Sequence, residues 1–147
     1  MSYTAGKASD YVAILADYTT QRGMTQAIDL KTKYPTGLPS ATTGSLSLKF
    51  NSINPRENAN IGNIWIDFNK ADGTKESKAV NFSKVLYMPF PTVISSYPST
   101  TSKFTDYSEQ VTVPAGTVRI LLNAYVGKGQ AGVFFLDNLD FSFPVAQ

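Results

Sequence analysis

The chain has 147 residues, the length of one domain, and its 42% hydrophobic and 16% charged residues describe a globular rather than a disordered protein. The 13 basic and 11 acidic residues leave a net charge of +2, which gives no electrostatic reason to expect nucleic acid or an anionic membrane as a partner. Histidine and cysteine are both absent from the sequence, which excludes Ser-His-Asp and Cys-His catalysis, zinc bound by histidine or cysteine, and disulfides.

Residues 1–24 are expected to form an N-terminal arm or an extra strand in front of a single domain over residues 25–147. The chain starts with polar residues and lacks the basic and apolar regions of a secretory signal. The segment Ser9–Asp17 fits either a capped helical turn or an extended strand with Val12 and Ile14 pointing inward. Of these two structures, we expect the strand.

Three later segments alternate apolar and polar residues with a period of two, as half-buried strands do. They are Ser45–Phe50, Asn63–Asn69 and Thr117–Val126. A fourth segment, Val133–Phe143, is almost continuously aromatic and aliphatic, which is typical of a strand buried along most of its length.

Glycine and proline mark the connections between these segments. Ala71–Gly73 is expected to be a hairpin turn with its glycine in a left-handed conformation. Residues 88–102 carry three prolines, which forbid a central strand and predict a long surface loop with Phe90 and Tyr97 as contact residues. About eight short strands separated by such turns predict an all-β fold, a two-sheet antiparallel β-sandwich of the jelly-roll type.

The C-terminal half carries two recognisable patterns. Phe104–Leu122 places a Val-Pro-Ala-Gly turn before a long strand, and Gly132–Phe141 holds an aromatic-x-Asp-Asn-hydrophobic pattern in the last one. Together with the upstream strands, over about residues 25–143, this order resembles the jelly-roll carbohydrate-binding modules. The resemblance implies a carbohydrate-binding-like sandwich, although the opening strand of the family is not found in residues 1–24.

The resemblance also implies a structural calcium ion. In the family this ion is held by the opening strand together with an aspartate of the last strand. Asp137 matches the aspartate, so it is the one predicted metal ligand, and no other cofactor is expected.

Four residues are candidates for binding a glycan or a protein partner. The pleat that buries its neighbours puts Trp65, the only tryptophan, on the outer face, where an indole can stack on a sugar ring or anchor an interface. The alternative is that a loop covers it. Tyr125 shares the outer face of its strand with Arg119 and Asn123, which is a set suited to sugar recognition or simply a solvated face.

Paired carboxylates could hydrolyse a glycosidic bond without histidine. The candidates on strands are Asp67, Asp137 and Asp140. Because Asp137 and Asp140 lie three residues apart, a regular strand would point them to opposite faces. We therefore expect the protein not to be an enzyme.

The expected role is non-catalytic interaction. The first hypothesis is a structural or decoration-type component of a larger assembly such as a virion, oligomeric in that context, which the Met1 start favours. The alternative is a carbohydrate-binding module of a secreted polysaccharide-degrading enzyme. The partners are then other protein chains or a polysaccharide, not nucleic acid or a membrane, and the location is the virion or the extracellular space, with no signal peptide in this chain.

Overall fold

The computed structural model describes residues 2–5, 12–17, 22–53, 62–80, 105–126 and 131–144. The regular structure in these ranges is all β-strand, and they contain no helix long and apolar enough to cross a membrane. The strands are β1 (Ser2–Ala5), β2 (Val12–Asp17), β3 (Arg22–Asp29), β4 (Thr42–Ile53), β5 (Gly62–Lys70), β6 (Lys75–Val80), β7 (Thr105–Val113), β8 (Thr117–Val126) and β9 (Ala131–Ser142).

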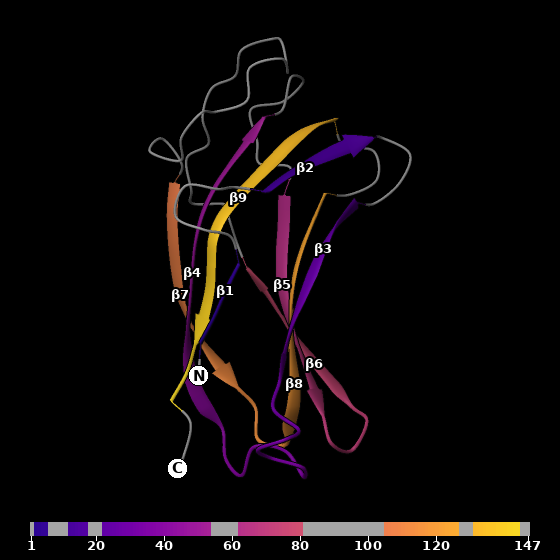
Figure 1. Ribbon diagram of the computed structural model, residues 1–147, viewed down its shortest axis with the longest axis vertical. Coiled ribbons are helices and arrows are strands. Elements are labelled where there is room, and N and C mark those ends of the chain that lie inside the picture. Colours follow the sequence, from indigo (N-terminus) through magenta and orange to yellow (C-terminus); the bar gives the residue numbers. More distant parts are fainter. Residues whose placement is uncertain are drawn as a thin grey trace.

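The strands form two antiparallel sheets that lie against each other as two layers (Figure 1). The five-stranded sheet has β4 between β7 and β9, and both β1 and β2 pair with the other edge of β9. The four-stranded sheet has the order β3-β8-β5-β6. The predicted all-β, two-sheet antiparallel sandwich is confirmed.

The core lies between the sheets, where alternate residues of each strand meet. Its largest fully buried side chains include Phe50, Phe134, Ile66, Ile120 and Leu122. Burying one such side chain stabilises the fold by roughly 1.5–3 kcal/mol, so the core strongly fixes the register of each strand. Because side chains alternate along a strand, the residues between the core residues point to the outer faces of the two sheets.

The structure has strands at the segments where the sequence pattern predicts them. The three alternating segments fall within β4, β5 and β8, and the apolar segment overlaps β9. Strand β2 occupies the second half of Ser9–Asp17, as expected for an extended segment. Strand β3 begins at Arg22, and the division of the chain at residues 24 and 25 stays a prediction.

The predicted turns have two outcomes. The turn at Ala71–Gly73 connects β5 to β6 and its glycine has a φ of 88°, as predicted. The proline segment 88–102, with Phe90 and Tyr97, lies outside the described residues, so its contact role stays a prediction.

Strand β9 contains a bulge at Asn138, which has a φ of 50°. Asp140 pairs with Ser47, but Asp137 pairs with Lys49, so the two residues of β9 between these pairs oppose the single residue Leu48 of β4. Because Ser47 and Lys49 share the outer face, Asp137 and Asp140 face the same way. The expectation that they point to opposite faces is wrong, since it assumed a regular strand.

Candidate functional site

The outer face of the four-stranded sheet carries the two predicted aromatic residues side by side. Trp65 on β5 lies opposite Asn123 of β8, and Tyr125 lies opposite Asn63, so the two aromatic residues are diagonal neighbours. Their rings stack with centroids 5.1 Å apart and an interplanar angle of 29°. Both side chains are half-buried. We call this pair the aromatic platform.

A glycine makes room for one half of the platform. Gly23 of β3 lies opposite Tyr125, and a Cβ atom there would come within 2.4 Å of the tyrosine ring. It would also come within 2.3 Å of the carbonyl oxygen of Ala124. Only glycine therefore lets the Tyr125 ring lie this close to β3.

Beside the platform, a row of hydrogen bonds crosses all four strands of the sheet. Thr25 of β3 donates to Asn123 Oδ1 at 2.7 Å, and Asn123 Nδ2 donates to Asp67 Oδ2 at 3.1 Å. Ser77 of β6 donates to Asp67 Oδ1 at 2.5 Å. The Tyr125 hydroxyl joins the row through Thr25 Oγ1 at 3.1 Å. We call these four polar residues with Tyr125 the polar row.

The centre of the polar row is buried. Asn123 is 4% exposed and Asp67 is 7% exposed, although both lie on the outer face of the sheet. Buried polar groups cost free energy unless they are hydrogen-bonded, and here each of the two side chains has partners on both sides. A satisfied network of this kind holds the side chains around the platform in fixed positions.

The other end of the same face is charged. Arg119 of β8 lies opposite Asp29 on one side and Asn69 on the other, and Asn69 lies opposite Lys75. In the described part of the chain neither Arg119 nor Lys75 forms an ion pair. Arg119 is six residues from Tyr125 along β8, or about 20 Å at the usual rise of a strand. The face therefore has an aromatic end and a charged end, and it is long enough for an extended ligand to contact both.

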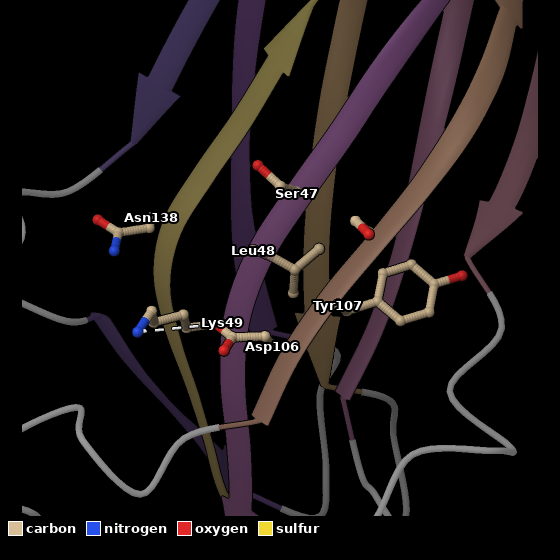
Figure 2. Close-up of a pocket in the computed structure, with 7 residues that line it drawn as sticks. Ser47, Leu48, Lys49, Asp106, Tyr107 and Asn138 are labelled. Atoms are coloured by element: carbon tan, nitrogen blue, oxygen red, sulfur yellow. Dashed lines mark ion pairs between the residues drawn. The ribbon is translucent and has the colours of Figure 1, made fainter.

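The outer face of the five-stranded sheet has a shallow pocket of different character (Figure 2). It has a volume of about 320 Å³ beside the β9 bulge, with Lys49, Asp106 and Asn138 among its lining residues. Lys49 Nζ and Asp106 Oδ1 pair with each other at 3.6 Å. Figure 2 shows the ring of Tyr107 directed away from this pair, and Tyr107 packs against the core. Although Tyr107 lines the pocket, its ring is turned from the Lys49–Asp106 pair, and the opposite charges of that pair are matched.

Asp137, the predicted calcium ligand, is 1% exposed. Its Oδ1 accepts a hydrogen bond from the Asn138 amide at 2.9 Å, whereas its Oδ2 is buried and has no hydrogen-bond partner among the described residues. A cation would satisfy such an oxygen. However, the described residues contain no group of three or more carboxylates, and calcium takes six to eight oxygens. One carboxylate does not make a calcium site, so Asp137 stays a predicted ligand only.

The three carboxylates considered for catalysis do not converge. Asp67 lies on the outer face of the four-stranded sheet, while Asp137 and Asp140 lie on the outer face of the five-stranded sheet. Packed sheets are about 10 Å apart, so the whole sandwich separates Asp67 from the other two. Asp67 is also occupied on both oxygens by Asn123 and Ser77.

The four predicted binding residues share one face, and three of them are in contact. Trp65, Tyr125 and Asn123 form one cluster, whereas Arg119 lies at the charged end. Thr25 and Ser77 are not among the residues predicted from the sequence, and Asp67 is predicted only as a catalytic candidate. The alternation of β5 already placed Asp67 on the outer face beside Trp65. Thr25 and Ser77 could not be found in this way, because their place depends on which strands pair.

Comparisons with known proteins concern the fold. No family model and no curated protein matches the chain. The chain is similar to a CBM4 structure at 20% identity and a TM-score of 0.53, over 91% of this chain and 71% of that chain. It is similar to the enzymatically active domain of tailspike protein 4 of bacteriophage CBA120 at 14% identity and a TM-score of 0.55. That match covers 98% of this chain but only 19% of the tailspike chain.

A further match is TmCBM61 in complex with β-1,4-galactotriose, at 11% identity and a TM-score of 0.46, over 98% of this chain and 88% of that chain. At such identities a likeness speaks for the fold alone. The CBM4 match, with its TM-score of 0.53, covers strands of both sheets of this chain. The chain thus has a two-sheet jelly-roll fold like that of the CBM4 structure.

Proposed function

We propose that this protein is a non-catalytic glycan-binding domain whose site is the outer face of the β3-β8-β5-β6 sheet. The observation that carries the proposal is the aromatic platform, Trp65 stacked on Tyr125, next to a row of fixed hydrogen-bonding groups. Aromatic rings offer apolar faces to the C–H surface of a sugar, and amide and hydroxyl groups bond to its hydroxyls.

The fold supports the same proposal. The CBM4 structure covers nearly the whole chain, and its name states a carbohydrate-binding module. The polysaccharide is accordingly the proposed partner. The separation of the carboxylates on two outer faces favours binding over hydrolysis.

The test is a panel of soluble and insoluble polysaccharides offered to the wild type, to Trp65→Ala and to Lys49→Ala. Lys49 lies on the opposite outer face and serves as the matched control. We expect wild type and Lys49→Ala to bind at least one polysaccharide equally, and Trp65→Ala to bind it about thirtyfold less tightly, the effect of losing a binding hot spot. Failure of the folded wild type to bind any member would overturn the proposal.

A second proposal is a structural or decoration-type component of an assembly such as a virion, with other protein chains as partners. One observation favours it, the likeness of the whole chain to part of a bacteriophage tailspike protein. The location that goes with this second proposal is the virion, and the location that goes with the first is the extracellular space. Light scattering at increasing concentration tests it: a defined oligomer supports the assembly role, and a monomer at all concentrations argues against it.

A further inference from the structure

The polar row fixes the direction of each of its hydrogen bonds. The carboxylate of Asp67 can only accept, so the Asn123 atom facing it at 3.1 Å is the amide nitrogen, which donates. Asn123 Oδ1 therefore faces Thr25, and an amide oxygen also can only accept. Thr25 has a single hydroxyl proton, and it is committed to Asn123.

The last bond of the row follows from this. Thr25 Oγ1 and the Tyr125 hydroxyl are 3.1 Å apart, and by geometry alone either could donate. Because the Thr25 proton is already used, the Tyr125 hydroxyl must be the donor. Its proton points into the row, and only its lone pairs remain for a ligand.

We propose that the polar row makes Tyr125 an acceptor and thereby selects glycans that present a free hydroxyl to it. The inference rests on the proposed glycan-binding function and adds a specificity to it. A free sugar hydroxyl donates to the Tyr125 oxygen, but an O-acetylated one has no proton to donate. The ester also brings a carbonyl acceptor against an oxygen that offers no proton. Sites built to bond a hydroxyl discriminate against ligands that lack it.

Thr25 and Asn123 are positioning residues in this account, and Tyr125 is the residue that contacts the glycan. Substituting Thr25 by valine keeps the shape of the side chain but removes the hydroxyl. The Tyr125 proton then loses its inward acceptor and can turn outward to an ester carbonyl. Serine at the same position keeps the hydroxyl and is the matched control.

The experiment uses xylan, mixed-linkage glucan, galactan and glucomannan, each de-esterified and after chemical O-acetylation. The readout is the ratio of affinities for the two forms of one polysaccharide. We expect wild type and Thr25→Ser to prefer the de-esterified form about fivefold, the effect of one hydrogen bond. We expect Thr25→Val and Tyr125→Phe, with their fold verified by circular dichroism, to bring the ratio close to one.

The outcomes separate the two proposals. If Thr25→Val keeps the wild-type preference, acetylation acts by bulk alone and the inference is wrong, while glycan binding stands. If the wild type binds both forms equally, the inference is also wrong. If the wild type binds neither form of any of the four polysaccharides, the inference is wrong for these polysaccharides. The proposed function is then decided by the panel of soluble and insoluble polysaccharides that tests it. If the polar row only held the side chains in place, Thr25→Val would weaken binding of the de-esterified and the O-acetylated form equally. The ratio of the two affinities would then stay unchanged.

Discussion

At the scale of the residue, the candidate site depends on a buried amide. Asn123 is 4% exposed and joins Thr25 on β3 to Asp67 on β5 from its place on the strand between them. Removing Asn123 leaves one oxygen of the buried Asp67 carboxylate without its partner, which costs more than the bond itself contributed. Asn123 is therefore as much a part of the fold as of the surface.

We expect Asn123→Leu to lower the free energy of unfolding by about 2 kcal/mol, because Asp67 and Thr25 each lose a partner. Asn63→Leu makes the same chemical change at an exposed position of the same face and should cost less than about 0.5 kcal/mol. Urea denaturation of both variants measures the difference. Equal costs would contradict the account.

The sequence predicted part of this site for a physical reason. Alternation along a single strand is enough to place Trp65, Tyr125, Arg119 and Asn123 on outer faces, since it depends only on neighbours in the chain. The contact of Thr25 with Asn123 joins residues 98 positions apart and depends on the pairing of β3 with β8. Alternation within a strand holds no information on that pairing.

At the scale of the element, the β5–β6 hairpin is closed by an aspartate turn. Asp72 Oδ1 accepts hydrogen bonds from the hydroxyl of Thr74 at 2.6 Å and from its amide at 2.8 Å. These bonds, the hydroxyl first, favour the charged carboxylate and hold the pKa of Asp72 below its ordinary value. The turn sets the register of β6, which carries Ser77 to Asp67.

Because the folded pKa of Asp72 is lowered, its stabilising effect is complete above the ordinary aspartate pKa of about 3.9 and is lost as the pH falls through the lowered value. Thr74→Val removes the hydroxyl donor, so we expect it to raise the pKa of Asp72 toward the ordinary value. Carboxyl chemical shifts followed by NMR during a pH titration test this. An unchanged midpoint in Thr74→Val would contradict it.

Two glycines with left-handed backbones provide a second test of the elements. Gly37 has a φ of 93° and Gly73 a φ of 88°. A Cβ atom on Gly37 would come within 2.2 Å of the Gly116 carbonyl oxygen, whereas one on Gly73 would meet nothing within 4 Å. The loop of Gly37 is bonded to the turn before β8, since Gly116 N donates to Leu38 O at 2.8 Å.

We expect Gly73→Ala to cost about 1–2 kcal/mol from backbone strain alone. Gly37→Ala should cost about 2–5 kcal/mol, because overpacking against the Gly116 backbone adds to the same strain. Chemical denaturation of the two variants compares them directly. If both cost the same, the Gly37 loop is not packed against the β8 turn as described.

The bulge in β9 shows where prediction from the pattern stops at this scale. The extent of β9 was anticipated from its apolar residues, but the extra residue at Asn138 was not. A bulge changes which face every later residue takes, and it is set by the pairing with β4 rather than by β9 alone. The face to which Asp140 points could therefore not be predicted from the sequence pattern of β9.

At the scale of the whole molecule, the two outer faces differ in chemistry. One carries the aromatic platform and the polar row, and the other carries matched charges beside a shallow pocket. The edges of the two sheets are joined by Lys78 of β6 and Glu109 of β7, whose charged atoms are 3.2 Å apart. We propose that the face with the aromatic platform, and not the opposite face, binds the ligand.

The single tryptophan makes that claim directly measurable, since all tryptophan fluorescence comes from Trp65. The measurement is a titration of the wild type with a polysaccharide that it binds, following the emission of Trp65 and its quenching by acrylamide. We predict a saturable change in emission and protection from the quencher, with the same midpoint as binding measured independently. Saturable binding that leaves both signals of Trp65 unchanged would contradict the account, because the glycan would then occupy another face.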